Sequence, residues 1–132
     1  MALNQVIYLD TNILVYLLEN HPNYGMAIAD TLRDRCDKGE ALTSSTILIT
    51  EFLAGSPGGS ISNLRAVPTL SFYPVDETVA VRAAELQKKH ALSIGDAIHL
   101  ATAVEVGAKW FYTNDVRLAK IVKHYIEIME IA

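Results

Sequence analysis

The order of apolar and polar positions near the N-terminus predicts a buried strand followed directly by a helix. Residues 6–9 form an uninterrupted apolar run, which indicates a strand buried on both faces, as in a parallel sheet. We expect Asp10 to be the last residue of this strand, at its carboxyl end, because a charged side chain is costly inside a dry sheet. Thr11 and Asn12 can hydrogen-bond the first amides of a helix, which the pattern predicts over residues 13–18.

The same analysis predicts strands and helices in alternation along the rest of the chain. We expect helices over residues 24–38, 46–54 (capped by Ser44 or Ser45), about 61–66, 77–90 (capped by Asp76), 93–106 and 116–123, and strands over residues 41–43, 70–73, 110–112 and 125–131, the last at a sheet edge. Residues 55–60, Gly-Ser-Pro-Gly-Gly-Ser, predict a loop. This alternation predicts an α/β fold of three layers, α/β/α, with a central, mostly parallel sheet.

Composition narrows the class of protein. The chain has 132 residues, of which 51% are hydrophobic, so we expect one globular domain over residues 1–132. A single cysteine, Cys36, excludes a disulfide framework or a cysteine zinc cluster. No apolar stretch is long enough for a membrane span and no signal-like segment begins the chain, so we expect a cytoplasmic protein without a membrane partner. The net charge of −4 disfavours a protein that binds nucleic acid through its bulk charge. It does not exclude a nucleic-acid-binding protein that holds metal ions, because the metals reverse the local sign of the charge.

Four acidic residues stand at positions where the surrounding sequence is apolar or structural. Asp10 ends the first strand, Asp96 lies in the first turn of a helix, and Asp115 follows strand 110–112. Glu51 interrupts an apolar helix, and we expect it to be buried there. No Lys or Arg lies within four positions of Asp10, Glu51 or Asp96. Because buried carboxylates need a partner, acids that converge without cations favour a site for Mg²⁺ or Mn²⁺.

Each acid also has a purely structural interpretation. Asp10 could cap a helix, and Asp96 and Asp115 could stabilise the positive ends of helices. Glu51 has the weakest structural interpretation, because it lies inside a helix and caps nothing. His99 lies near the face of Asp96 and could touch a substrate or a water, but a core or rim histidine is favoured, since hard oxygen-binding metals do not call for histidine.

Four motifs resemble the PIN-domain family, in order and over essentially the whole chain. They are Leu-Asp-Thr-Asn at 9–12, Thr-Glu-Phe at 50–52, Gly-Asp-Ala-Ile-His-Leu-Ala-Thr-Ala at 95–103, and Thr-Asn-Asp at 113–115. The third motif is the most specific. Within this family the chain resembles the VapC toxins of prokaryotic toxin–antitoxin pairs.

The resemblance implies a PIN-like fold and a metal-dependent endoribonuclease that hydrolyses RNA phosphodiester bonds. The residues that it implies as metal-binding and catalytic are Asp10, Glu51, Asp96 and Asp115. The residues that it implies as supporting are Asn12, Thr113 and Asn114. Mg²⁺ or Mn²⁺ would activate a water, with Asp10 as the central ligand, and one carboxylate, for example Glu51, could accept the proton of the water.

The resemblance also implies partners. A cognate antitoxin would bury apolar residues against the α/β body and send a basic side chain into the acidic pocket. A homodimer is implied as well, and we expect its surface on the apolar helices around residues 46–66.

Three other function classes compete with this interpretation. An Asp-nucleophile phosphatase would need a second acid two residues after the first, where this chain has Asn12. A receiver domain would need its central acid at a strand end, whereas Glu51 lies in a helical run. A non-catalytic PIN-like scaffold that only binds RNA or protein should have lost some of the acids, and this chain has all four.

Overall fold

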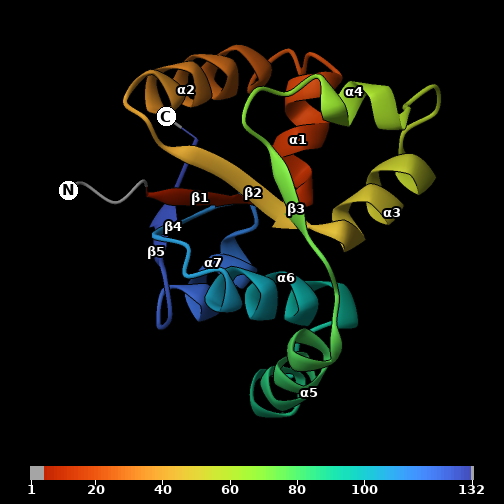
Figure 1. Cartoon of the computed structure of the whole chain (residues 1–132), viewed down its shortest axis with the longest axis vertical. Coiled ribbons are helices and arrows are strands. Elements are labelled where there is room, and N and C mark those ends of the chain that lie inside the picture. The colour runs from red at the N-terminus through yellow and green to blue at the C-terminus, as the bar shows by residue number, and fades with distance from the viewer. Residues whose placement is uncertain (1–4, 132) are drawn as a thin grey trace.

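The fold is built on a five-stranded sheet in which every pair of neighbouring strands is parallel. A computed structural model describes residues 5–131. The strand order is β3-β2-β1-β4-β5, which puts β1 in the middle (Figure 1). The strands are β1 (Val6–Leu9), β2 (Ala41–Ser45), β3 (Ser71–Tyr73), β4 (Trp110–Tyr112) and β5 (Glu127–Met129). The predicted α/β fold with a central parallel sheet is confirmed.

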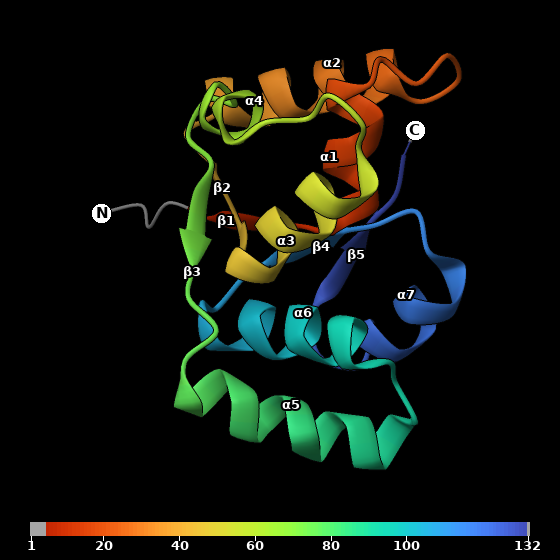
Figure 2. The same ribbon diagram turned by 90° about the vertical axis from the view of Figure 1, so that its right-hand side faces the viewer.

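Helices cover both faces of this sheet. In Figure 2 one group lies above the sheet and the other below it. The upper group is α1 (Thr11–Leu18), α2 (Gly25–Asp37), α3 (Thr46–Gly55) and α4 (Ile61–Arg65). The lower group is α5 (Glu77–His90), α6 (Ile94–Glu105) and α7 (Val116–Val122). The three-layer arrangement is therefore also as predicted.

The side chains of β1 point alternately to the two faces of the sheet, which explains why the protein has two cores. Ile7 and Leu9 pack with α1, α2, α3 and α4, whereas Tyr8 packs with α5, α6 and α7. Successive side chains of a strand point to opposite faces, so a strand between two helical layers must be apolar at every position. All three side chains are fully buried.

The predicted boundaries need one correction of chemical interest. Helix α1 begins at Thr11, two residues earlier than expected, and its N-cap is Asp10 rather than Thr11 or Asn12. Asp10 lies one residue past the end of β1, yet its N–H still donates to the carbonyl of Tyr112, at 3.0 Å. The last strand is also shorter than predicted, because only Glu127–Met129 pairs with β4.

The order of the strands places the candidate residues together. From β1 the chain proceeds outward to β2 and β3, and later returns to the other side of β1 to form β4 and β5. Ligand sites of open α/β sheets lie at the carboxyl ends of the strands where this change of direction occurs. Asp10 follows β1 at that edge and Thr113 follows β4, its neighbour.

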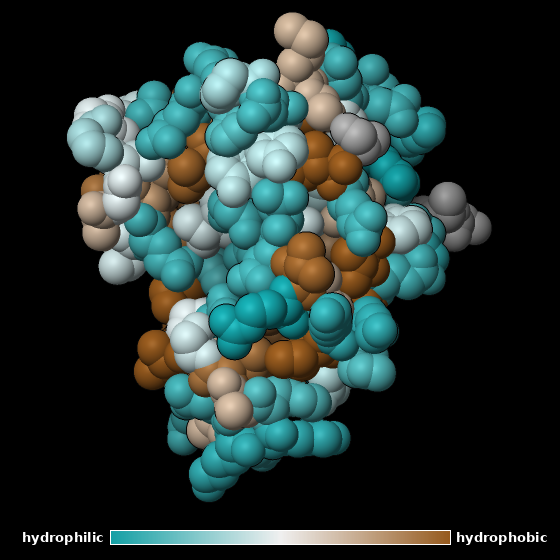
Figure 3. All heavy atoms as spheres, turned by 180° about the vertical axis from the view of Figure 1, so that it is seen from behind, coloured by the Kyte–Doolittle hydropathy of each residue, from teal (hydrophilic) through white to brown (hydrophobic). Residues whose placement is uncertain are grey.

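The outer surface is mostly polar, with a few exposed apolar side chains. Figure 3 shows hydrophilic residues interrupted by small apolar areas on the face opposite to that of Figure 1. The most exposed large apolar side chains are Met26, Val116 and Ile94. Over residues 5–131, every helix is too short or too polar to traverse a bilayer.

Candidate active site at the carboxyl edge of the sheet

Asp10 is the most buried of the four candidate acids, with 5% of its surface exposed. Its Oδ1 accepts a hydrogen bond from the N–H of Thr11 at 2.9 Å, which caps α1. Its Oδ2 accepts one from Thr113 Oγ1 at 2.7 Å and one from Asn12 Nδ2 at 3.3 Å. These donors fix the orientation of the carboxylate. Asp10 is thus both a helix cap and the centre of a polar cluster.

The turn after β4 is tied to the turn after β1 by hydrogen bonds. The N–H of Asn114 donates to Asn12 Oδ1 at 3.2 Å. Thr113 Oγ1 accepts from the N–H of Asp115 at 3.0 Å while it donates to Asp10. Asp115 caps α7 by accepting from the N–H of Leu118 at 3.1 Å. The three residues predicted to support the site therefore lie beside Asp10, and Asn114 contributes through its backbone.

Glu51 enters the site from α3 and is held at one oxygen. Its Oε1 accepts from Thr11 Oγ1 at 2.6 Å and from His99 Nε2 at 2.6 Å. The hydrogen bond from His99 holds the pKa of Glu51 below its ordinary value, against the effect of burial. The expectation that Glu51 is buried is wrong: 37% of its side chain is exposed, because the carboxylate projects from the apolar helix to the edge of the site.

His99 is the residue that the sequence-based hypothesis undervalued. It is 1% exposed, as a core histidine should be, but both of its ring nitrogens face polar groups. Nδ1 lies 2.6 Å from the hydroxyl of Tyr8, and Nε2 contacts Glu51 and Thr11 and lies 3.9 Å from Asp10 Oδ1. Burial alone would lower the pKa of His99, but the hydrogen bond to Glu51 and the nearby carboxylates raise it.

The position of His99 could have been noticed in the sequence. It lies three residues after Asp96, so the two share one side of α6 within a single turn. The hydrogen-bond partner of His99 could not be predicted from the sequence. Glu51 lies 48 positions away, and the packing of α3 on α6 brings it near.

Asp96 lies in the first turn of α6, next to Ser93, which caps that helix. Burial raises the pKa of Asp96, and the charges of Asp10 and Asp115 raise it further. Asp10 and Asp115, which lie 86 and 19 positions from Asp96 in the sequence, thus repel Asp96 at one edge of the sheet. Gly95 brings Glu51 to the same place, since a Cβ on Gly95 would lie 3.1 Å from Glu51 Oε2.

The carboxylate oxygens of the site are of the type that binds a hard divalent cation, although they are not arranged as a complete coordination site. Within residues 5–131 no three His, Cys, Asp or Glu side chains are arranged so that they would hold a metal ion. Carboxylate oxygens are nevertheless the ligands that Mg²⁺ and Mn²⁺ prefer, and these ions keep several waters in place of protein ligands. A cation would also relieve the repulsion that raises the pKa of Asp96.

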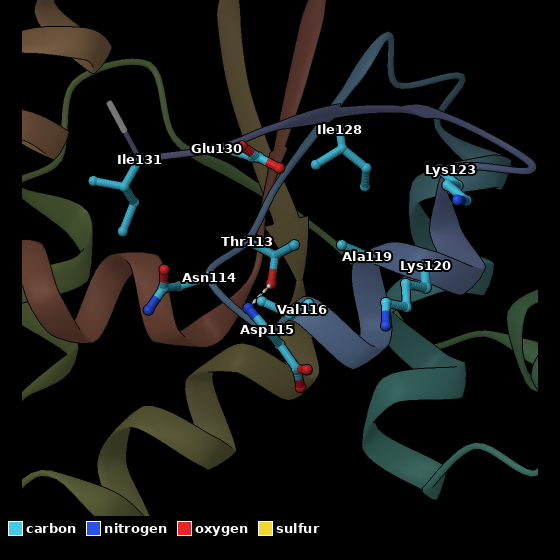
Figure 4. Close-up of a pocket in the computed structure, with 10 residues that line it drawn as sticks. All are labelled: Thr113, Asn114, Asp115, Val116, Ala119, Lys120, Lys123, Ile128, Glu130 and Ile131. Carbon is cyan, nitrogen blue, oxygen red and sulfur yellow. Dashed lines mark hydrogen bonds between the residues drawn. The ribbon is translucent and has the colours of Figure 1, made fainter.

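A groove of about 510 Å³ adjoins Asp115. Figure 4 shows Asp115 and Thr113 beside helix α7. The groove is lined by Lys120 of α7 and by Lys123, the residue that follows this helix, with Glu130 across from them. Both lysines are exposed, and neither takes part in the ion pairs found among residues 5–131. Cationic side chains therefore lie next to the acidic cluster.

Comparison with solved structures supports the fold. VapBC2 from Rickettsia felis, bound to a DNA fragment from their promoter, contains a chain that is similar with a TM-score of 0.75 and 18% identity, over 96% of this chain and 98% of that one. A chain of FitAcB from Neisseria gonorrhoeae is similar with a TM-score of 0.66 and 19% identity, over 93% of this chain and 96% of that one. A chain of a toxin–antitoxin complex from Klebsiella pneumoniae is similar with a TM-score of 0.63 and 22% identity, over 83% of this chain and 86% of that one. No curated protein matches the sequence.

The sequence itself matches a family model. The model of the PIN domain aligns with residues 7–124, a range that begins in β1 and includes all four candidate acids. It therefore covers far more than half of the 132 residues. The chain belongs to the PIN domain family.

Proposed function

We propose that this protein is a divalent-metal-dependent endoribonuclease, the toxin of a toxin–antitoxin pair, with Asp10, Glu51, Asp96 and Asp115 as its metal-binding and catalytic residues. The observation that carries the proposal is electrostatic. Burial raises the pKa of Asp96, and the charges of Asp10 and Asp115 raise it further. Among the described residues no Lys or Arg forms an ion pair with these three acids, and the cation that comes near is His99, 3.9 Å from Asp10 Oδ1. Such an arrangement is unfavourable for stability and is typical of a functional site.

The chain provides each part that metal-assisted hydrolysis needs. Bound at these carboxylates, Mg²⁺ or Mn²⁺ would supply an activated water and would neutralise charge on the phosphate. The carboxylate of Asp10 is oriented by hydrogen bonds from Thr113 and Asn12. Glu51 is half-exposed, and its lowered pKa keeps it ionised at neutral pH, as a group that accepts a proton from the water must be.

The groove beside Asp115 supports a nucleic-acid substrate. An RNA strand bound at the acidic site needs cations for its neighbouring phosphates, because the net charge of the protein is −4. Lys120 in α7 and Lys123 directly after it offer two such cations. We therefore assign this groove to the RNA backbone on one side of the scissile bond.

Toxin function, a cognate antitoxin and a homodimer are part of the same proposal. The structures of similar fold include complexes described as toxin–antitoxin pairs. A homodimer surface on α3 and α4 is consistent with the exposure of Leu53, 42% of whose surface is accessible. A cytoplasmic location belongs to the proposal and is consistent with activity on RNA. A scaffold without catalysis is disfavoured because all four acids are retained, and an Asp-nucleophile phosphatase because Asn12 stands where its second acid would be.

The test is cleavage of total and synthetic RNA by the purified protein. We expect cleavage with Mg²⁺ or Mn²⁺, loss of cleavage in EDTA, and a loss on the order of 10²-fold or more in Asp10→Asn and Asp96→Asn. Asp96→Asn should be as stable as the wild type or more stable without metal, because its charge is unfavourable there. Asp37→Asn is the matched control, since it removes the same charge from an exposed position on α2.

Expression in cells extends the test to toxicity. The wild type should stop growth, whereas Asp10→Asn should not. Cleavage that persists in EDTA, or Asp10→Asn that cleaves at the wild-type rate, would contradict the proposal.

A further inference from the structure

The two oxygens of Glu51 have different surroundings. Oε1 receives two short hydrogen bonds, from Thr11 Oγ1 and His99 Nε2, both at 2.6 Å. Among residues 5–131 no hydrogen bond reaches Oε2, which lies against Gly95 at the first turn of α6. One oxygen is thus bound by the protein and the other is free to bind something else.

His99 is itself fixed in place. Its ring is 1% exposed and lies edge-on to Tyr8, with ring centroids 5.7 Å apart. The carboxylate of Glu51 accepts from Nε2, so this nitrogen carries a proton. Burial raises the pKa of Tyr8, which keeps its hydroxyl protonated as the partner of Nδ1. The chain from Tyr8 through His99 to Glu51 therefore begins in the core and ends at the site.

We propose that His99 is a positioning residue that, together with Thr11, occupies Oε1 of Glu51 and so presents Oε2 alone to the acidic site. Without these two bonds Glu51 could rotate on its flexible side chain, because α3 itself holds it only at the backbone. With them, Glu51 acts through one oxygen, either as a monodentate ligand or as the acceptor of a proton from water. This role rests on the proposed function for what Oε2 binds.

Hydrogen-bonding partners of ligand side chains typically change metal affinity or activity by about 10- to 100-fold when they are removed. The partner in this case is a histidine on a helix different from that of the ligand, and it approaches through the core. The bond therefore also couples the packing of α3 on α6 to the geometry of the site.

The test is a matched pair of substitutions at one position. The amide of glutamine can reach the place of Nε2, so His99→Gln keeps a donor to Glu51 and loses the contact with Tyr8. The amide of asparagine reaches only the place of Nδ1, so His99→Asn keeps the contact with Tyr8 and loses the donor to Glu51. Both variants are polar and smaller than histidine, so their folding costs should be similar.

Two readouts are needed, and one does not depend on activity. Binding of Mn²⁺ alone is measured by electron paramagnetic resonance, and RNA cleavage is measured as kcat and KM. We expect His99→Gln to bind Mn²⁺ within about threefold of the wild type, and His99→Asn to bind about tenfold more weakly with a lower kcat. Thr11→Val, which removes the other donor to Oε1, should weaken Mn²⁺ binding in the same direction.

The outcomes separate the two proposals. Equal Mn²⁺ affinity and kcat in the wild type, His99→Gln and His99→Asn would overturn the role of His99, even if both variants melt at lower temperature. If the wild type binds Mn²⁺ but cleaves no RNA, the proposed function fails, while the difference in Mn²⁺ affinity still decides the role of His99. If His99→Asn does not fold, the Mn²⁺ affinity of Thr11→Val decides whether donors at Oε1 matter.

Discussion

Gly95 offers the sharpest test of the geometry, because one methyl group there should separate activity from stability. Gly95 is the second residue of α6, and an alanine Cβ at this position would lie 3.1 Å from Glu51 Oε2. That distance is shorter than an ordinary van der Waals contact, so the carboxylate must move by a few tenths of an ångström. Among residues 5–131 the only side chain in the way is Glu51, the proposed functional group itself.

The expected effect on rate follows from this displacement. Misplacing a reacting group by about 1 Å can cost on the order of 10²-fold in rate, so a few tenths correspond to roughly three- to fivefold in kcat. The expected effect on stability has the opposite sign. Gly95 does not have a positive φ, and replacing such a glycine by alanine stabilises a protein by about 0.4–1 kcal/mol through the unfolded state. Part of that gain is offset by the close contact.

The assay compares kcat on a synthetic RNA with urea unfolding of the metal-free protein. Gly55→Ala is the matched control, since Gly55 ends α3, has no positive φ and has no neighbour within 4 Å of an added Cβ. It should gain stability without losing rate. If Gly95→Ala cleaves as fast as Gly55→Ala, then Glu51 is not held against Gly95, and the inferred presentation of Oε2 is wrong.

Two further predictions concern substrate binding and pH. Substituting Lys120→Gln and Lys123→Gln together should weaken RNA binding, measured by fluorescence anisotropy, and should reduce the slope of log affinity against log salt by up to about 1.4 for a single strand; an unchanged slope would place the RNA elsewhere. Without metal, the free energy of unfolding of the wild type relative to His99→Gln should be largest near pH 5.5. The raised pKa of His99 stabilises the fold below its unfolded value of about 6.5, and the lowered pKa of Glu51 stabilises it above about 4.3. The difference should shrink as pH rises through the folded pKa of His99, and urea unfolding that shows the same difference at pH 5.5 and pH 9 would contradict this coupling.

Local sequence determined the elements because each depends on nearby residues. The four-residue run of β1 has to be buried on two faces, and a cap such as Asp76 fixes where α5 begins, so helix 77–90 was predicted at both ends. Helix α1 was placed two residues late because two interpretations of one segment competed. Asp10 was assigned to the strand, whereas its carboxylate in fact caps the helix.

The four acids were also selected from the sequence, because each contradicts its apolar or structural surroundings. Sheet topology brings Asp10 and the turn that bears Asp115 together, since β1 and β4 are neighbours and the turns after them meet. The sequence could not give the surroundings of each carboxylate. Whether Glu51 is buried, and which of its oxygens is free, depends on side chains that come from separate helices.

The pattern of residues along the chain thus determined the fold class, the order of the elements and the candidate acids, since these follow from periodicity and from charges in apolar segments. Only the tertiary structure decided that His99 is the partner of Glu51. Hydrogen bonds between side chains 48 positions apart depend on how α3 and α6 pack, and nothing in local sequence specifies that contact. A histidine that looked like an ordinary core residue is therefore the link between the core and the acidic site.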